Sequence, residues 1–171
     1  MRATIRRATT RDLDVLASLW SDVWHESHRD IVPAALLPHR TRIGFRRRLS
    51  RKLDDCLVCE SGVSTVGFAT VARDGGELEQ LFIARCARGQ GVALQLLRQA
   101  EVELVNRGAS VGHLFALARN VVALRFYERA GWTRGEKPVM FNAEIESGTF
   151  PLECYRFERA FPEQTRDSAL L

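Results

Sequence analysis

Apolar side chains along the chain recur with the two spacings that distinguish helices from strands. Steps of three and four predict amphipathic helices in four segments. These segments begin near Thr10 and run past Val23, or cover residues 39–53, 91–108 and 120–130. The helix over residues 39–53 is expected to bury Ile43, Phe45 or Leu49 and to turn its arginines toward solvent.

Seven further runs have the composition and length of strands, and turn residues separate most of them. They cover residues 3–7, 56–60, 64–73, 77–83, 112–118, 132–143 and 150–161. The second to fourth runs are expected to form three antiparallel strands, and the last two a closing hairpin. The resulting order β-α-α-β-β-β-α-β-α-β-β predicts one α+β domain over residues 1–161, followed by a flexible tail at residues 162–171.

The composition is typical of an ordinary soluble protein. Of 171 residues, 46% are apolar and 27% are charged, a balance that argues against intrinsic disorder. No apolar run approaches the roughly 18 residues that a membrane-spanning helix needs, and the N-terminus lacks the apolar core of a signal peptide. We therefore expect a cytoplasmic protein with no membrane partner.

The positive charge is concentrated in the first third of the chain. Residues 1–60 carry 12 basic and 8 acidic side chains, whereas residues 61–171 carry 13 of each, which gives the net charge of +4. Most of the excess lies between Arg40 and Lys52. A solvated helix face explains such a run, and the excess is too small to predict a nucleic-acid partner.

Cysteine and histidine spacings do not predict a metal site. Cys56 and Cys59 fall in a strand-like run, where a period of two places them on opposite faces. His25 and His28 lie three residues apart, not the four that a metalloprotease helix requires. No metal cofactor is expected.

The most informative segment runs from a strand through a glycine-bearing loop into a helix. Gly89 and Gly91 permit backbone conformations in which successive N–H groups converge. The helix start adds unpaired N–H donors and a positive dipole end, which suits a pyrophosphate, and Arg88 adds a charge beside it. A Rossmann fingerprint is excluded because Leu94 stands where the third glycine belongs, and the chain has no Gly-Lys pair for a P-loop.

Two sequence patterns in this half of the chain resemble one family. Arg88-Gly-Gln-Gly91-Val-Ala93 is an R-x-x-G-x-A pattern that resembles the acetyl-CoA loop of the GNAT superfamily of N-acetyltransferases. Residues 120–132 resemble its second signature, N-x-x-A-x-x-F-Y-x-x-x-G-[FW]. The element order is also similar, so the resemblance covers residues 5–159. It implies the GNAT fold, a mixed, mostly antiparallel sheet of about seven strands flanked by about four helices, and an acetyl-CoA-dependent N-acetyltransferase.

The loop itself predicts an anion site made of backbone amides. Its N–H groups belong to Gly89, Gln90, Gly91, Val92 and Ala93. The resemblance implies that the strand ending at Phe82-Ile83 splays from the one ending at Ala118. The pantetheine arm would lie in that gap, and a backbone N–H near Ile83 would polarise the thioester carbonyl.

The second signature supplies three further candidates by resemblance. Tyr127 is implied as the general acid that protonates the departing thiolate. Asn120 would contact the cofactor or fix the strand-to-helix turn. Phe126 would either border the cofactor or serve as a core aromatic side chain.

A general base is needed because an amine acceptor is mostly protonated at neutral pH. Glu77 and Glu79 are the candidates, since residues two apart in a strand share a face. The resemblance matches Glu77 to a base position of some family members and Glu79 to a neighbouring one. A water relay and a merely solubilising role for either glutamate stay open.

The acceptor is less well defined by the sequence. Trp20, Trp24, His25 and His28 are expected on the acceptor side, which leaves primary amines of small molecules and of peptides open. The arginines of residues 40–52 would favour neutral or anionic acceptors where they face the pocket. The alternative is a catalytically silent GNAT-like binding module that docks this basic face on an acidic partner or nucleic acid. Homodimerisation through the closing hairpin also stays open.

Overall fold

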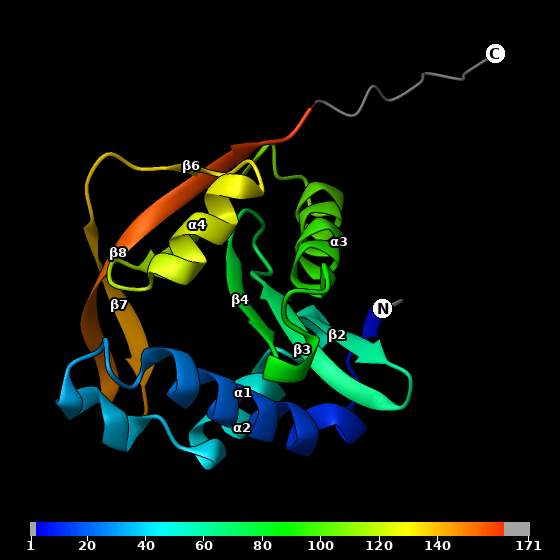
Figure 1. The fold of residues 1–171 in the computed structure, drawn as a ribbon, viewed down its shortest axis with the longest axis horizontal. Helices are drawn as coiled ribbons and strands as arrows, with labels where there is room; N and C mark the ends of the chain where they lie inside the picture. The colour runs from blue at the N-terminus through cyan, green and yellow to red at the C-terminus, as the bar shows by residue number, and fades with distance from the viewer. Residues whose placement is uncertain (1–2, 163–171) are drawn as a thin grey trace.

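The computed structural model describes residues 3–162 and has the α+β architecture expected from the sequence (Figure 1). Within these residues the strands are β1 (Thr4–Arg7), β2 (Cys56–Ser61), β3 (Ser64–Val71), β4 (Leu78–Ile83), β5 (Val111–Leu117), β6 (Thr133–Arg134), β7 (Val139–Ile145) and β8 (Gly148–Ala160). The α-helices are α1 (Leu13–His28), α2 (Arg42–Arg51), α3 (Val92–Asn106) and α4 (Val121–Arg129).

Two antiparallel half-sheets make up the β-structure. One has the strand order β1-β2-β3-β4, and the other has the order β5-β8-β6 with β7 paired to β8. A single parallel bridge between Glu77 and His113 joins the two halves at β4 and β5. The edge between these two strands is therefore closed at one end and unpaired along the rest.

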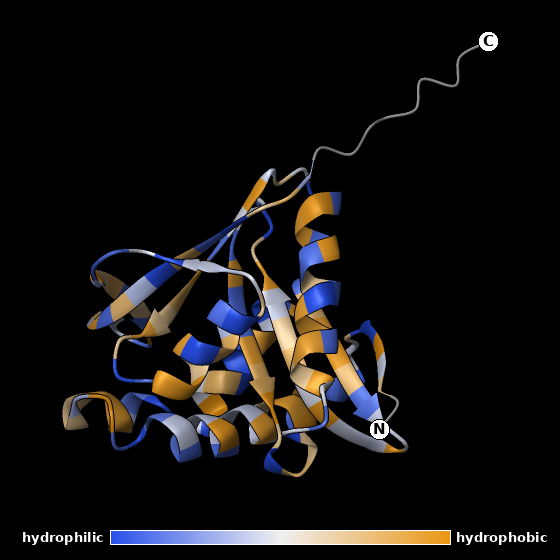
Figure 2. Cartoon of the chain, turned by 45° about the horizontal axis from the view of Figure 1, so that its top comes forward, coloured by the Kyte–Doolittle hydropathy of each residue, from blue (hydrophilic) through white to orange (hydrophobic). Residues whose placement is uncertain are grey.

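Two apolar cores lie on opposite faces of the β-structure, and each includes residues of both half-sheets. One cluster packs α3 against the sheets through Leu96, Leu97 and Leu104. The other packs α1 and α2 against the opposite side through Leu16, Phe45 and other buried side chains. In Figure 2 the central strands are largely hydrophobic, whereas the helices carry both hydrophobic and hydrophilic residues. This agrees with the amphipathic spacing from which the helices were predicted.

The predicted hairpin differs from the structure in one respect. Residues 132–143 form two strands, β6 and β7, where the sequence predicted one. Gly135 donates its N–H to the Arg156 carbonyl at 2.8 Å, and Pro138 follows with no N–H to offer to a ladder. The strand therefore breaks before Val139, which gives eight strands within residues 3–162 where about seven were expected.

The predicted helix over residues 39–53 needs two corrections. It begins at Arg42, because the Thr41 hydroxyl accepts the Gly44 N–H at 3.0 Å and so caps the helix there. Ile43 is exposed, whereas Phe45 is fully buried. The prediction that the arginines of this segment all face solvent is wrong, because Arg40 is only 5% exposed.

Two expectations concern the membrane and the chain end. Within the part of the chain that the structure describes, no helix combines the length and the hydrophobicity needed to cross a bilayer. The predicted tail at residues 162–171 lies, except for its first residue, outside the described residues.

Candidate active site

The junction of the two half-sheets opens into a cavity of about 380 Å³. At its closed end the His113 N–H donates to the Gly76 carbonyl at 2.6 Å. From this point β4 and β5 diverge, and residues of both strands line the cavity, as do residues of α1, α2, α4 and β7. The splay expected between these two strands is therefore present.

The β4 edge turns backbone groups toward this gap. The Ala84 N–H donates to the Val66 carbonyl at 2.8 Å, which makes these two residues a hydrogen-bonded pair of the β3–β4 ladder. Hydrogen-bonded pairs alternate along an antiparallel ladder, so Phe82 also bonds to β3. The N–H and carbonyl groups of Leu81 and Ile83 consequently point away from β3, toward β5.

The β5 edge mirrors this arrangement. The Ala118 N–H donates to the Glu153 carbonyl at 3.0 Å, and the register of β5 and β8 then makes Ala116 a hydrogen-bonded residue. The backbone groups of Phe115 and the Leu117 N–H therefore point toward β4, while the Leu117 carbonyl accepts the Asn120 N–H at 2.9 Å. An extended ligand that carries amide groups can bond to both edges.

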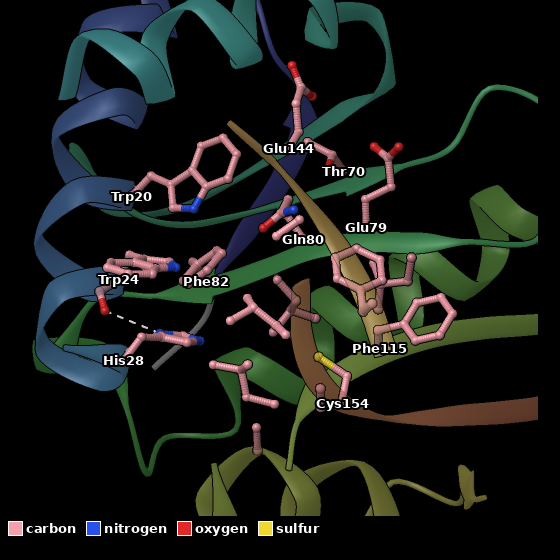
Figure 3. Close-up of a pocket in the computed structure, with 18 of the residues that line it drawn as sticks. Trp20, Trp24, His28, Thr70, Glu79, Gln80, Phe82, Phe115, Glu144 and Cys154 are labelled. Carbon is pink, nitrogen blue, oxygen red and sulfur yellow. Dashed lines mark hydrogen bonds between the residues drawn. The ribbon is translucent and has the colours of Figure 1, made fainter. Parts of the chain in front are cut away.

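A β-bulge distorts β4 beside the candidate bases. Thr70 pairs with Gln80 while Val71 pairs with Leu78, so Glu79 is an extra residue without a partner on β3. Bulges redirect side chains and are common beside active sites. Here the bulge leaves Glu79 with its side chain at the cavity wall (Figure 3).

The two candidate bases lie together, but in different electrostatic surroundings. Glu77 and Glu79 both line the cavity. Glu79 forms an ion pair with Lys52 at 2.6 Å, whereas the nearest basic partner of Glu77 within the described residues is His113, at 3.8 Å. Burial and the neighbouring Glu79 charge raise the pKa of Glu77 above its usual range.

The glycine loop presents the donors that its sequence predicted. Gly89 and Gly91 adopt φ values of 72° and 78°, a conformation that side chains disfavour. A Cβ at either position would meet no atom within 4 Å, so the requirement for glycine is conformational and not steric. The N–H groups from Gly89 to Leu94 have no intramolecular hydrogen-bond partner in residues 3–162. They are available to an anion at the start of α3.

The Arg88 side chain was expected to place a free positive charge beside this loop, but it is bound to other residues. Its Nε donates to the Ile83 carbonyl at 3.3 Å, and its guanidinium pairs with Glu26 of α1 at 2.8 Å. Glu26 also lies 3.8 Å from Arg85. The Arg88 charge is thus partly compensated, and its side chain ties the loop to β4 and α1.

The second signature places its residues on and before α4. The Asn120 side chain accepts the Ala123 N–H at 3.1 Å, which caps the helix and corresponds to the turn-fixing alternative. Tyr127 lines the cavity and is buried, and burial raises the pKa of its phenol. Phe126 is half-buried in the core under α4, and it does not line the cavity.

Aromatic side chains of α1 and β4 line one side of the cavity (Figure 3). Trp24 stacks on His28 with ring centroids 5.3 Å apart, and Phe82 adjoins His28 at 6.0 Å. Burial lowers the pKa of His28 to about 4, so this imidazole is neutral at pH 7. Of the four side chains expected here, Trp20, Trp24 and His28 line the cavity, but His25 instead bonds through Nε2 to the Arg40 carbonyl.

Arg40 and Arg48 line the cavity, as the sequence allowed for arginines of residues 40–52, whereas the polar cavity residues Thr70, Gln80, Asn142 and Glu144 were not predicted. The Arg48 guanidinium lies over the Trp20 ring, 4.6 Å from its centroid. A helical signal for it was present, because Phe45, Arg48 and Leu49 occupy neighbouring positions on one helix face.

Among the residues the structure describes, no three His, Cys, Asp or Glu side chains are grouped so that they could hold a metal ion.

Comparisons with known proteins agree with this geometry. Residues 39–145 match the family model of the acetyltransferase (GNAT) domain. An uncharacterized N-acetyltransferase of Archaeoglobus fulgidus is 30% identical over 142 residues, which cover 77% of this chain and 94% of the relative.

Solved structures share the fold. A GCN5-related N-acetyltransferase from Rhodopseudomonas palustris superimposes with a TM-score of 0.75 at 18% identity, over 94% of this chain and 97% of that one. The PaiA N-acetyltransferase from Thermoplasma acidophilum, solved in complex with coenzyme A, gives 0.70 at 16% identity, over 94% and 100%. With its fold, its glycine loop and more than half of its length matched by the family model, the chain belongs to the GNAT superfamily of acetyltransferases, enzymes that use acetyl-CoA as acyl donor.

Proposed function

We propose that this chain transfers the acetyl group of acetyl-CoA to a primary amine of a small molecule or peptide, by direct attack within a ternary complex. The observation that carries the proposal is the gap between β4 and β5. Backbone groups of both strands point into it, the glycine loop follows the end of β4, and the gap widens into a cavity that holds carboxylates and a buried tyrosine.

The residues present fit acetyl-CoA, which would supply an activated acetyl thioester. The unpaired N–H groups of the loop, from Gly89 to Ala93, suit the pyrophosphate because they converge at the positive end of α3. The backbone groups of β4 and β5 that point into the gap suit the amide groups of the pantetheine arm. The Ile83 N–H, which points into the gap, is placed to bond to the thioester carbonyl.

A protonated amine loses two protons in all, one to the base before attack and one as the amide forms, while one proton reaches the sulfur, so one proton is released overall. The amine nitrogen forms a bond to the acetyl carbon while the carbon–sulfur bond breaks. Glu77 is the better candidate to accept the proton, since its raised pKa makes it a stronger base and Lys52 holds Glu79. Tyr127 is the candidate donor to the thiolate, because its raised pKa keeps the phenol protonated at neutral pH. A water relay between the amine and Glu77 is compatible with this assignment.

Calorimetric titration with acetyl-CoA tests the cofactor site. Gly91→Glu places a side chain and a negative charge where the loop N–H groups would hold the pyrophosphate, so we expect it to abolish measurable binding. Gly62→Glu is the matched control, because Gly62 also has a positive φ, of 61°, and open space around it, but it lies in the β2–β3 turn. Equal binding by the wild type and Gly91→Glu, or no binding by the wild type, would overturn the assignment.

The alternative of a silent module that docks through residues 40–52 finds no support in the arrangement of charges. Three exposed arginines of α2 form ion pairs with acidic residues: Arg46 with Asp14, Arg47 with Glu146, and Arg51 with Glu144. These pairs compensate most of the positive charge that such a docking face would need.

A further inference from the structure

We propose that the acceptor is an amine that also carries a carboxylate, and that Arg40, Arg48, Trp20 and Thr70 bind this carboxylate. The inference rests on the proposed function, because it assigns the substrate class of the same cavity. Its basis is a set of hydrogen-bond donors, all in the cavity wall, that the protein itself leaves without acceptors.

Three buried polar atoms of the cavity wall have no hydrogen-bond partner within residues 3–162: Trp20 Nε1, Arg40 Nε and Thr70 Oγ1. Each belongs to a side chain that is 5% exposed or less. Buried polar groups are nearly always paired in folded proteins, because an unpaired one loses its bonds to water without replacement. All three can donate a hydrogen bond, and a carboxylate accepts several at once.

Arg48 adds a fourth donor group to this set. Its guanidinium lies 4.6 Å from the Trp20 ring centroid and 4.9 Å from that of Phe45, and it forms no ion pair with a carboxylate in the described part of the chain. Burial and the nearby Arg40 charge lower the pKa of Arg48 to about 10. An anion between the two guanidiniums would relieve their repulsion and replace the lost solvent.

The acidic side chains of the cavity form their direct ion pairs with other residues, so within residues 3–162 neither Arg40 nor Arg48 has a carboxylate in direct contact. Glu79 pairs with Lys52, Glu144 pairs with Arg51, and Glu77 lies beside His113. Arg40, by contrast, bonds only to the backbone carbonyl of Glu144, at 2.9 Å. The cavity thus holds guanidiniums without a direct carboxylate partner together with carboxylates, which matches the opposite charges of an amino acid.

A single negative charge fits this site better than a phosphate. Glu144 lines the same cavity and its charge acts on both guanidiniums, so a dianion would meet stronger repulsion than a carboxylate. Figure 3 draws Trp20, Thr70 and Glu144 at the end of the cavity opposite Cys154. The carboxylate-binding end and the acidic residue that limits its charge are therefore close together.

The test measures how the enzyme, supplied with acetyl-CoA, uses acceptors that differ in a single group. Each scaffold (aliphatic, branched and aromatic α-amino acids, and β-amino acids) is supplied as the free acid, the carboxamide, the decarboxylated amine and the aminophosphonate. Thiol release from acetyl-CoA gives kcat/KM, and calorimetry on the CoA-loaded protein gives affinity. We expect at least one free acid to exceed its carboxamide and its decarboxylated amine by about tenfold or more, the effect of one charge-assisted hydrogen bond.

Variants assign this preference to the named side chains. Arg48→Gln should reduce it about 10- to 100-fold, mainly through KM, while the decarboxylated amines change little. Arg47→Gln makes the same change one residue away, outside the cavity, and should keep the preference. Thr70→Val removes one donor at nearly constant shape, and Trp20→Phe removes the indole N–H with a smaller ring, so both report on the site even where an arginine variant folds poorly.

The results separate this inference from the proposed function. No acetyl-CoA binding by the wild type overturns both. Binding of acetyl-CoA with no preference for any free acid overturns the carboxylate site alone, as does a preference that survives in Arg48→Gln, Thr70→Val and Trp20→Phe. Tighter use of the aminophosphonates would likewise overturn the choice of a carboxylate.

Discussion

Replacing Tyr127 with phenylalanine separates the catalytic role proposed for this residue from its role in packing. Its ring lies against Phe126, Phe157 and Trp132, with centroids 5.1, 5.6 and 6.4 Å away. Phenylalanine keeps every one of these contacts and removes only the hydroxyl oxygen. That hydroxyl makes no hydrogen bond to any residue of the 3–162 range. The oxygen therefore contributes nothing to the fold through protein partners.

The two expected effects differ greatly in size. Tyr127 lines the cavity, and its oxygen is not among the fully buried unpaired atoms of residues 3–162, so its removal should change the free energy of unfolding by less than about 1 kcal/mol. For a chain of this length, about 1 kcal/mol corresponds to a Tm shift of about 2–4 °C. Loss of a general acid lowers the rate about 10²- to 10⁴-fold. Tyr127→Phe should therefore be as stable as the wild type and far less active.

Thermal unfolding and thiol release across pH measure both quantities on one preparation. Tyr155→Phe is the matched control, because Tyr155 is the second of the chain's two tyrosines and lies outside the cavity. It should keep wild-type turnover. Unchanged turnover in Tyr127→Phe would refute the acid assignment, and a loss of stability beyond 1 kcal/mol would refute the claim that the hydroxyl is unpaired.

Three further changes test other parts of the structure. Glu26→Gln frees Arg88 from a half-exposed ion pair, and it should raise the affinity for acetyl-CoA about two- to fivefold at low salt with little change in stability, as calorimetry and urea unfolding would show. Gly67→Ala places a Cβ 2.5 Å from Ile83 Cδ1 and 2.8 Å from the Phe82 carbonyl, so it should cost about 1–3 kcal/mol and weaken acetyl-CoA binding through displacement of β4. His28 has its pKa lowered from 6.5 to about 4, so the stability it contributes is complete above pH 6.5 and falls as pH drops toward 4, by up to about 3 kcal/mol relative to a His28→Phe variant in urea titrations.

Each of these expectations can fail independently. An affinity of Glu26→Gln that equals the wild type in low salt would mean that Arg88 does not act on the phosphates. A Gly67→Ala variant with wild-type stability would show that β4 can move away from the added Cβ without loss of free energy of unfolding. Parallel pH profiles for the wild type and His28→Phe between pH 4 and 6.5 would contradict a neutral buried imidazole.

Local regularities in the sequence account for most of the fold. Helical spacing located α1, α3 and α4 to within a few residues, because each buries one apolar face along its whole length. The break between β6 and β7 was missed although Gly135 and Pro138 lie in the segment. Both residues are tolerated at strand edges, so their presence alone does not decide where a ladder ends.

The cofactor half of the site was predictable because it is built from the backbone. Glycine is the residue that permits positive φ without strain, so the residue type alone indicates the conformation that Gly89 and Gly91 adopt. The side chain of Arg88 was harder to place. Its partner, Glu26, is 62 positions away in the sequence, and no local pattern relates the two.

The acceptor half depends on side chains that meet only in the folded molecule. Arg48 lies beside the buried stripe of α2 and was assigned to solvent because the run of arginines around it is solvated. The pairing of Lys52 with Glu79 and the bulge at Glu79 depend on how α2 lies against β4, which periodicity does not determine. Thr70 gave no signal, because a buried threonine is ordinary in a strand.

This division between backbone and side chains separates cofactor recognition from acceptor choice. The donors assigned to acetyl-CoA are main-chain N–H groups of β4 and of the α3 start, which most side-chain substitutions leave intact. The groups assigned to the acceptor carboxylate come from α1, β3, α2 and the segment just before α2, and none belongs to the glycine loop. Substitutions at Arg48 or Thr70 can therefore change which amine is acetylated without a change in acetyl-CoA affinity. Gly91 substitutions, in contrast, should reduce turnover of every acceptor in the same proportion.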